Sequence, residues 1–447
     1  MKKSKVTNFR YTPGYHVYSR GGWINDPNGL IYYQGYYHVF FQYYPYDSKW
    51  GPMHWGHRRS KDLVHWEELP VALTPTDEEG CFSGSAVVYK DKLCLIYTAH
   101  HVIEIDGKEQ VFQDQCLATS DDGVNFTKYE GNPIISLAPE DNSEDFRDPK
   151  VWDAGGIFKI VVGSRTKDNL GRVLLYESVD LKNWIFKGEI ARATTATDEG
   201  YMWECPDLFR LNGEDVLIMS PQGIKPREGK FKNLHQTGYL IGKLKNNYLA
   251  IPKREFKELD LGHDFYAAQT FLAPDGRRLL IAWMDMWEKK LPEQADGWAG
   301  MLTFPRELIL KGETLYMQPV AEIAKLRSKL LAQTVQTDWQ LELPARRLEL
   351  QISAHTTFTL EISYGQEKLK LSKSGEVLTL EKTDADKRTT IYENNKTELR
   401  ILMDTSSVEI FVKGGPTFSE RLYGSKNTKL TFQSEKQAEI LVYKLEV

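Results

Sequence analysis

The chain has 447 residues, of which 41% are hydrophobic, and its 57 Lys and Arg against 62 Asp and Glu give a net charge of −5. This length predicts two domains, or one large repeat assembly with an accessory domain, and allows a sizeable core. The weakly acidic balance provides no basic surface for nucleic acid, and no run reaches the roughly 18 consecutive apolar residues of a membrane span.

The N-terminus and the cysteines indicate a compartment. Residues 1–11 are basic, but no apolar run follows them, so this segment does not resemble a secretion signal. Cys81, Cys94, Cys116 and Cys205 show neither CxxC spacing nor histidines at zinc-ligand intervals. We therefore expect reduced thiols in the cytoplasm, although a processed secreted chain would look the same. Because the ten histidines are scattered, we expect neither a metal ion nor another cofactor.

Short alternating strands fill the first two thirds of the chain. The hairpin pattern, in which apolar and polar residues alternate around a central turn, occurs at residues 30–44, 85–100, 151–165, 207–220 and 270–284. Long helical periods are absent from this region. These two thirds are therefore predicted to be all-β.

Two series of short motifs repeat at intervals of roughly 60 residues. Each member of the first series begins with a serine, at Ser60, Ser120 and Ser178. An aspartate lies two residues after this serine, and an aromatic residue lies six residues after it. The second series has five members, each directly before a predicted hairpin: Asn25-Asp26-Pro27, Phe82-Ser83-Gly84, Arg147-Asp148-Pro149, Glu204-Cys205-Pro206-Asp207 and Asp264-Phe265-Tyr266. One such period fits a four-stranded blade. Five members therefore predict a five-bladed β-propeller, in preference to a sandwich or a solenoid.

The pattern changes near residue 318. Ile323, Leu326 and Leu330 recur at helical spacing, which predicts a linker helix over residues 319–334. From residue 335 onward strands return at intervals of about 8 to 12 residues, which is typical of a β-sandwich. We therefore expect an all-β protein, with a propeller over residues 1–318, the helix, and a C-terminal β-sandwich domain over residues 335–447.

Quasi-symmetry should bring three acidic residues together. Equivalent positions at the head of each innermost strand ring one end of a propeller channel, so Asp26, Asp148 and Glu204 are expected to lie close together. Hydrolysis of a glycosidic bond with retention needs two carboxyl groups roughly 5 to 5.5 Å apart, one as nucleophile and one as proton donor. Each carboxylate alone is commonly a turn cap or a solvated side chain, so the shared repeat carries the prediction.

The surroundings of each carboxylate suggest its role. Asp26 lies among side-chain and backbone amides, so it is expected to stay ionised near its ordinary pKa and to act as the nucleophile. Glu204 lies between Trp203 and Cys205, an apolar setting that is expected to raise its pKa and suit it to proton donation. Arg147 is expected to hold its neighbour Asp148 ionised, ready to bind sugar hydroxyls.

Several motifs in order resemble glycoside hydrolase family 32, which contains invertases, sucrose-6-phosphate hydrolases and fructan hydrolases. They are WINDPNG at 23–29, HWGHRRSKDLVHWEELPVAL at 54–73, FSGSAV at 82–87, FRDPKVW at 146–152, WECPDLF at 203–209 and GHDFYAAQTF at 262–271. WAGMLTFPREL at 298–308 and SSVEIF at 406–411 extend the resemblance to nearly the whole chain. The family implies the same architecture, a five-bladed propeller with a β-sandwich.

The resemblance also implies site residues. Asp26 would be the nucleophile, Glu204 the general acid and base, and Asp148 the stabiliser of the transition state. Trp287 is included although its surroundings follow the family pattern only loosely. The implied wall of the fructosyl pocket is Asn25, Gln42, Trp50, Phe82, Ser83, Arg147, Tyr266 and Trp287; for Trp50 and Phe82 ordinary propeller core is the alternative.

The expected function is the removal of terminal β-fructofuranosyl units from sucrose, sucrose 6-phosphate or short fructans by double displacement. The small-molecule sugar is the only partner that we expect. A fructosyltransferase and a non-catalytic carbohydrate-binding propeller remain as alternatives. The loop of residues 224–239 contains Lys225, Arg227, Lys230 and Lys232; we interpret it as a solvated loop, with phosphate binding as the alternative.

Overall fold

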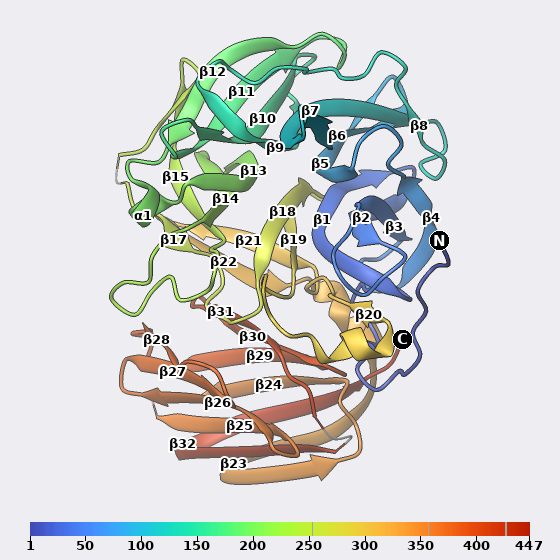
Figure 1. Cartoon of the computed structure of the whole chain (residues 1–447). Coiled ribbons are helices and arrows are strands. Elements are labelled where there is room, and N and C mark those ends of the chain that lie inside the picture. Colours follow the sequence, from blue (N-terminus) through green and yellow to red (C-terminus); the bar gives the residue numbers. More distant parts are fainter. Residues whose placement is uncertain (253, 356, 425–426) are drawn as a thin grey trace.

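The computed structural model describes residues 1–252, 254–355, 357–424 and 427–447. It confirms the predicted fold class, because five separate small sheets are arranged around an axis and a larger C-terminal sheet packs below them (Figure 1). Among the described residues, no helix is long and apolar enough to cross a membrane.

Each blade of the propeller is one antiparallel sheet. Blade I consists of β1 (Gly22–Tyr33), β2 (Tyr36–Tyr44), β3 (His54–Ser60) and β4 (Trp66–Leu73). Blade II consists of β5 (Gly80–Tyr89), β6 (Lys92–Ile105), β7 (Lys108–Ser120) and β8 (Thr127–Lys128). Blade III consists of β9 (Asn142–Asp153), β10 (Phe158–Thr166), β11 (Gly171–Ser178) and β12 (Ile185–Arg192). Blade IV contains β13 (Met202–Leu211), β14 (Glu214–Gln222), β15 (Gly238–Lys245), β16 (Tyr248–Ala250) and β17 (Lys257–Glu258). Blade V contains β18 (Tyr266–Leu272), β19 (Arg278–Trp283), β21 (Arg306–Lys311) and β22 (Thr314–Pro319).

The innermost strands β1, β5, β9, β13 and β18 surround the axis, and each contacts the next around the ring. The ring is closed by β20 (Trp298–Ala299), which pairs in parallel with β1 although it lies in the chain after the first strands of blade V. Each of the five repeated motifs therefore lies in an innermost strand or directly before it, one in each blade.

The serine–aspartate motif forms the turn between the third and fourth strands of blades I, II and III. In the first copy Asp62 Oδ1 accepts the backbone N–H groups of Val64 and His65 at 3.3 and 3.0 Å. Asp122 and Asp180 accept the corresponding N–H groups at 2.8 to 2.9 Å. A short carboxylate that satisfies its own turn explains why this motif recurs at each outer turn.

Three short helical elements lie outside the blades in the described part of the first 326 residues. A short helix, α1 (Ala196–Glu199), precedes blade IV, and a 3-10 helix, η1 (Pro292–Asp296), precedes β20. Helical spacing predicted a helix over residues 319–334, but the structure has a 3-10 helix, η2 (Ala321–Leu326), and then a long strand. Ile323 and Leu326 are buried as expected, whereas Leu330 is 44% exposed on that strand, so it takes no part in the helical apolar stripe.

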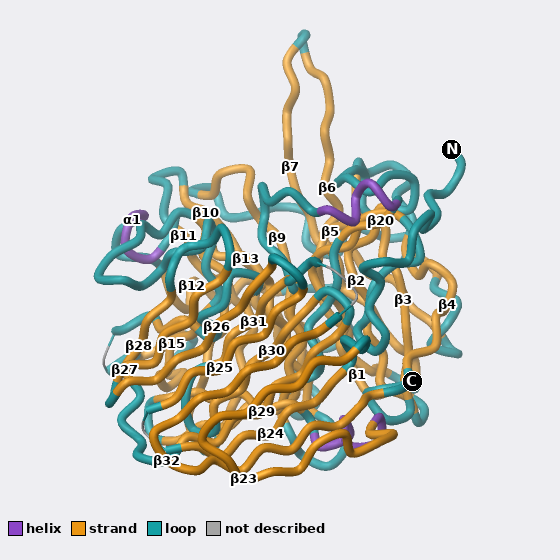
Figure 2. The backbone as a smooth tube through the Cα atoms, turned by 90° about the horizontal axis from the view of Figure 1, so that it is seen from below, coloured by secondary structure: helices purple, strands orange, loops and turns teal. Residues whose placement is uncertain are grey.

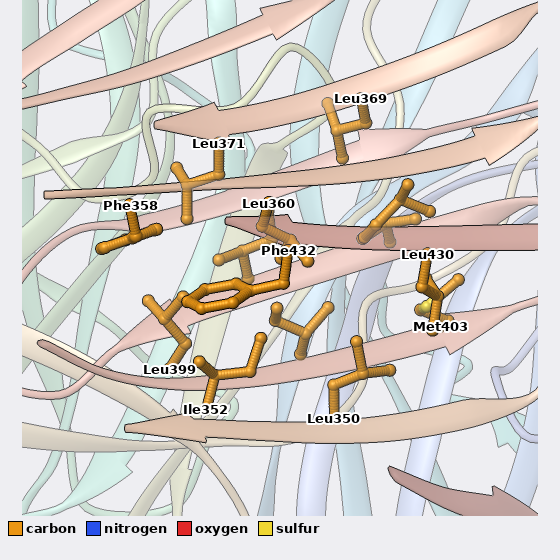
Figure 3. Close-up of a cluster of buried hydrophobic side chains, with 14 of the residues drawn as sticks. Leu350, Ile352, Phe358, Leu360, Leu369, Leu371, Leu399, Met403, Leu430 and Phe432 are labelled. Carbon is orange, nitrogen blue, oxygen red and sulfur yellow. The ribbon is translucent and has the colours of Figure 1, made fainter. Parts of the chain in front are cut away.

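The C-terminal sheet consists of β23 (Arg327–Leu343), β24 (Leu348–Ala354), β25 (Phe358–Tyr364), β26 (Glu367–Ser374), β27 (Val377–Lys382), β28 (Arg388–Ile391), β29 (Thr397–Asp404), β30 (Ser407–Val412), β31 (Thr417–Arg421) and β32 (Thr428–Leu445). The first half of β32 pairs with β25 and its second half with β24, so this strand joins two layers. Inward-facing side chains from both layers fill the core, where the rings of Phe358 and Phe432 stack with centroids 6.0 Å apart (Figure 3).

A buried ionic network fastens the propeller to the sandwich. Arg306 of β21 is fully buried and donates to Asp260 Oδ2 at 2.9 Å and to Glu409 Oε2 of β30 at 2.5 Å. His16, which precedes blade I, contacts Asp404 Oδ2 at 2.8 Å and Glu409 Oε1 at 2.7 Å. Although burial lowers the pKa of His16, the two carboxylates raise it to about 9, so the ring is cationic at neutral pH.

Arg306→Met is expected to destabilise the folded protein by about 3 to 5 kcal/mol, because it leaves the buried carboxylate of Asp260 without its cation and Glu409 with His16 alone. Lys92→Ala is the control, since its pair with Asp121 is solvent-exposed and such pairs contribute about 1 kcal/mol or less. Urea unfolding followed by tryptophan fluorescence measures both. Equal unfolding midpoints for the two variants would show that the network contributes nothing.

Blade II carries a projection. Beyond residue 100, β6 and β7 continue as a two-stranded hairpin past their neighbours β5 and β8, and Figure 2 shows this hairpin standing clear of the propeller. Its tip is the turn between Ile105 and Lys108. The base of the hairpin therefore belongs to blade II, and the tip faces solvent.

Candidate active site

Strand irregularities direct the key side chains. Asp148, Cys205 and Ala267 occupy the corresponding positions of β9, β13 and β18, and all three have left-handed backbone conformations, with φ of 64°, 48° and 54°. The pairing register of β13 and β18 with their neighbours shifts at the same points. Such bulges turn the preceding or bulged side chain away from the ordinary alternation of a strand. The repeat in the sequence thus corresponds to a repeated bulge at one end of the axis.

Asp26 lies in β1 among hydrogen-bond donors. Its Oδ1 accepts from Asn25 Nδ2 at 3.1 Å, and its Oδ2 accepts from Ser83 Oγ at 2.7 Å. Asn25 is fixed in turn, because Trp23 Nε1 donates to its Oδ1 at 2.8 Å. Blades I and II therefore hold this carboxylate in one orientation.

Glu204 is clamped by two residues of the other blades. Arg147 of β9 donates to Glu204 Oε1 through Nε and Nη2, at 3.0 and 2.8 Å, and the Tyr266 hydroxyl donates to Oε2. The remaining guanidinium nitrogen of Arg147, Nη1, donates to Asp145. Both oxygens of Glu204 are thus occupied from neighbouring blades III and V, which fixes the direction in which this carboxyl group points.

Asp148 is placed as predicted, but its partner differs from the prediction. We expected Arg147 to pair with it, whereas the Arg147 guanidinium pairs with Glu204 and Asp145, and Asp148 Oδ2 accepts the backbone N–H of Cys205 at 2.9 Å. Burial and the charge of Glu204 raise the pKa of Asp148 to about 7, and the Arg147 charge only partly opposes this. The bulge at Asp148 explains the error, because it turns adjacent side chains in different directions.

Two of the three carboxylates contact one sulfur atom. Cys205 Sγ lies 3.6 Å from Asp26 Oδ2 and 3.6 Å from Asp148 Oδ2. The charge of the third, Glu204, raises the pKa of both aspartates. Cys205 was not among the predicted site residues, although it stands inside the WECPDLF motif. The signal available for it was its position within a repeated motif, beside a predicted acid.

The pKa of Asp26 also differs from the expectation. We expected a value near the ordinary one, but burial and the charge of Glu204 raise it to about 6, although the hydrogen bonds from Ser83 and Asn25 lower it. The sequence shows the amide donors beside Asp26. The burial of Asp26 and its distance from Glu204 depend instead on the closed ring of blades.

The acid limb of kcat/KM is expected near pH 6, because the nucleophile role predicted for Asp26 requires an ionised carboxylate and kcat/KM reports the pKa values of the free enzyme. Activity should therefore fall as the pH drops below about 6. Ser83→Ala removes a hydrogen bond that lowers this pKa, so it should move the limb to higher pH. Initial rates on sucrose, measured as a function of pH, test this prediction. As a control, enzyme exposed to low pH should regain its full activity when it is returned to pH 7. An acid limb near pH 4 contradicts the prediction.

The other predicted wall residues differ in their surroundings. Gln42 is buried and donates to the Cys81 carbonyl at 3.0 Å. Trp50 is 47% exposed and meets the Phe82 ring edge-on at 6.1 Å, so it lies at the rim and is not part of the core. Trp287 stacks on Trp23, the residue that orients Asn25, with ring centroids 6.0 Å apart.

Two further residues at the site were missed. Asp145 pairs with Arg147 and Arg165, and its place two residues before Arg147 was the available signal. His100, from β6, stacks on Phe82 with ring centroids 4.2 Å apart. No motif pointed to His100, because only the pairing of β5 with β6 brings it beside Phe82.

Fold and site together define a class of protein. A propeller whose innermost strands bring an aspartate and a glutamate to one end of its axis, each oriented by hydrogen bonds, is a glycoside hydrolase of the two-carboxylate type.

Comparison with known proteins specifies the family. The N-terminal domain model of glycosyl hydrolases family 32 matches residues 16–319, and the C-terminal model of that family matches residues 319–447. The chain belongs to this family. A sucrose-6-phosphate hydrolase of Zymomonas mobilis is 40% identical, over 95% of this chain and 89% of that protein, and a raffinose invertase of Escherichia coli is 40% identical, over 93% and 90%.

Solved structures agree with this assignment. A GH32 beta-fructofuranosidase of Bombyx mori superposes with a TM-score of 0.92 at 40% identity, covering 98% of this chain and 95% of that one. A sucrose-6-phosphate hydrolase of Lactobacillus gasseri superposes with a TM-score of 0.88 at 29% identity, covering 99% and 94%. The family predicted from the sequence motifs is therefore confirmed.

Proposed function

We propose that this protein hydrolyses the bond between a terminal β-fructofuranosyl unit and its leaving group in sucrose-type substrates, with retention of configuration. The observation that carries the proposal is the proximity of the three carboxylates: Asp26 and Asp148 both contact Cys205 Sγ, and the charge of Glu204 raises the pKa of both. Incubation with sucrose, followed by quantification of both sugars, tests it: equal amounts of free glucose and fructose are expected. Glucose in excess over free fructose would indicate transfer to another sugar, and no release would overturn the proposal.

Each carboxylate has a role that its surroundings suit. Asp26 attacks the anomeric carbon, because donors on both of its oxygens hold it in one orientation. Glu204 protonates the bridging oxygen and then activates water to release fructose. Asp148 accepts hydrogen bonds from the fructosyl hydroxyls, and these strengthen as positive charge develops on the sugar ring.

The remaining residues bind or orient. Arg147 and Tyr266 fix Glu204, while Ser83 and Asn25 fix Asp26. In this proposal the rest of the fructosyl pocket is formed by Gln42, Trp50, Phe82 and Trp287.

The loop of residues 224–239 is proposed to be a solvated loop. Arg227 pairs with Asp198 at 3.1 Å and Lys232 with Asp386 at 3.4 Å, so two of its four cations are already neutralised. Lys225 and Lys230 are exposed.

Replacing both Lys225 and Lys230 with alanine is expected to change the ratio of kcat/KM for sucrose 6-phosphate to that for sucrose by less than about twofold, because exposed charges contribute little to binding. The ratio comes from parallel assays of one preparation. A selective loss of efficiency on the phosphorylated sugar would assign phosphate binding to this loop.

Compartment and domain boundaries are part of the proposal. All four cysteines are buried free thiols, which suits a reducing cytoplasm. We divide the chain into a propeller over residues 1–318, a short linker that contains η2, and a sandwich that begins with β23 at Arg327, because the boundary expected at residue 335 lies inside this strand. The two family models meet at residue 319, which supports the end of the propeller.

A further inference from the structure

His100 lies on the face of β6 that borders the active site. Two residues earlier on the same face, Thr98 Oγ1 accepts the backbone N–H of Asp148 at 3.1 Å. Because alternate residues of a strand share a face, His100 lies about 7 Å further along that face, toward the hairpin tip and away from Asp148. There its ring stacks on Phe82, whose ring Trp50 also meets edge-on. His100 therefore lies beside a proposed wall residue of the fructosyl pocket, further from Asp148 than Thr98 is.

A chain of hydrogen bonds fixes the tautomer of His100. The backbone N–H of Phe146 donates to Gln113 Oε1 at 2.8 Å, which determines the orientation of this amide. The NH₂ group of Gln113 therefore faces His100 and donates to its Nδ1 at 3.1 Å. A nitrogen that accepts a hydrogen bond carries no proton, so the neutral imidazole has its proton on Nε2.

The charge state of His100 agrees with this assignment. Burial lowers its pKa to about 4, and the positive charge of Arg147 acts in the same direction. The ring is therefore neutral at physiological pH. The side chain is partly exposed, and Nε2–H has no hydrogen-bond partner within the described parts of the chain. One oriented donor on a partly exposed ring is thus available to a ligand.

We propose that His100 binds the leaving-group sugar by donating Nε2–H to one of its hydroxyl oxygens, and that Gln113 is a positioning residue that fixes the required tautomer. This inference rests on the proposed function and assigns the side chain that recognises the leaving hexosyl unit. The ring stacking on Phe82 sets the plane of the donor, and the contact with Gln113 sets its tautomer.

The test compares two substrates that share the fructosyl unit. Sucrose has hydroxyl groups on its leaving unit, whereas methyl β-D-fructofuranoside has none. His100→Phe keeps a ring against Phe82 but removes the donor, so it should lower the ratio of kcat/KM for sucrose to that for the methyl fructoside about tenfold. His100→Gln, with an amide N–H near the place of Nε2, should keep this ratio within about threefold of the wild-type value.

Because one preparation is assayed with both substrates, the ratio does not depend on the folded fraction. Gln113→Met should also lower the ratio, whereas a merely structural role of Gln113 would lower both efficiencies equally. His101→Phe is the matched control, since His101 faces the other side of β6 and pairs with Asp114. An unchanged ratio in His100→Phe, or an equal change in His101→Phe, overturns the inference. Failure of the wild-type protein to cleave either fructoside would instead overturn the proposed function.

Discussion

Asp26→Asn is expected to lower kcat on sucrose by about 10⁴-fold or more, because the amide cannot form the covalent fructosyl intermediate. The substitution keeps the size of the side chain and an acceptor for the Ser83 hydroxyl, which donates to Asp26 Oδ2 at 2.7 Å. Steady-state rates with a coupled glucose assay measure the effect. A loss of less than about tenfold would remove Asp26 from the role of nucleophile.

The same variant should be more stable than the wild-type protein. Because burial and Glu204 raise the Asp26 pKa from 3.8 to about 6, ionisation of Asp26 destabilises the fold as the pH rises through this interval. The amide that replaces the carboxylate carries no charge, so the variant should gain on the order of 2 kcal/mol at pH 7 and nothing below the unfolded-state pKa. Lost turnover with a raised unfolding midpoint excludes unfolding as the cause of inactivity.

Glu204→Ala is expected to lower kcat on sucrose by about 10³ to 10⁴-fold, because it removes the proton donor of the first step and the base of the second. Added azide should partly restore turnover on a fructoside with a good leaving group, since an azide anion needs no general base. The product should be fructosyl azide with retained configuration, identified by NMR.

Glu214→Ala, on the adjacent strand β14, is the control for Glu204. Its carboxylate forms a solvent-exposed pair with Lys243, so turnover should stay within about twofold of the wild-type value. Near-normal turnover in Glu204→Ala would remove Glu204 from the acid and base role. Rescue by azide in the Asp26 variant but not in the Glu204 variant would exchange the two roles.

The arrangement of the carboxylates could be predicted because the repeat is local. A motif recurring at a fixed interval predicts equivalent positions in equivalent blades, and closure of the ring then brings Asp26, Asp148 and Glu204 together. Neither step needs knowledge of side-chain packing. The fold class and family were therefore accessible from the sequence.

The electrostatics of the site were not accessible in the same way. Arg147 precedes Asp148 in the chain, but the bulge directs its guanidinium to Glu204 of the next blade. The pKa of Asp26 depends on burial and on Glu204, which is 178 positions away in the sequence and adjacent only in the closed ring. The position of His100 beside Phe82 depends on the pairing of β5 with β6 alone. Sequence neighbours predict these properties poorly because through-space neighbours determine them.

The contact of His16 with Asp404 and Glu409 has a consequence for biosynthesis. His16 lies ten positions before Asp26, the proposed nucleophile. The partners of His16 lie 388 and 393 residues further along the chain. A nascent chain on the ribosome can form its blades one after another. His16, however, has neither of its two partners until the C-terminal strands have emerged. Chains that terminate before residue 404 thus lack both carboxylates that hold His16, so the first segment is fixed only after most of the sandwich has been synthesised.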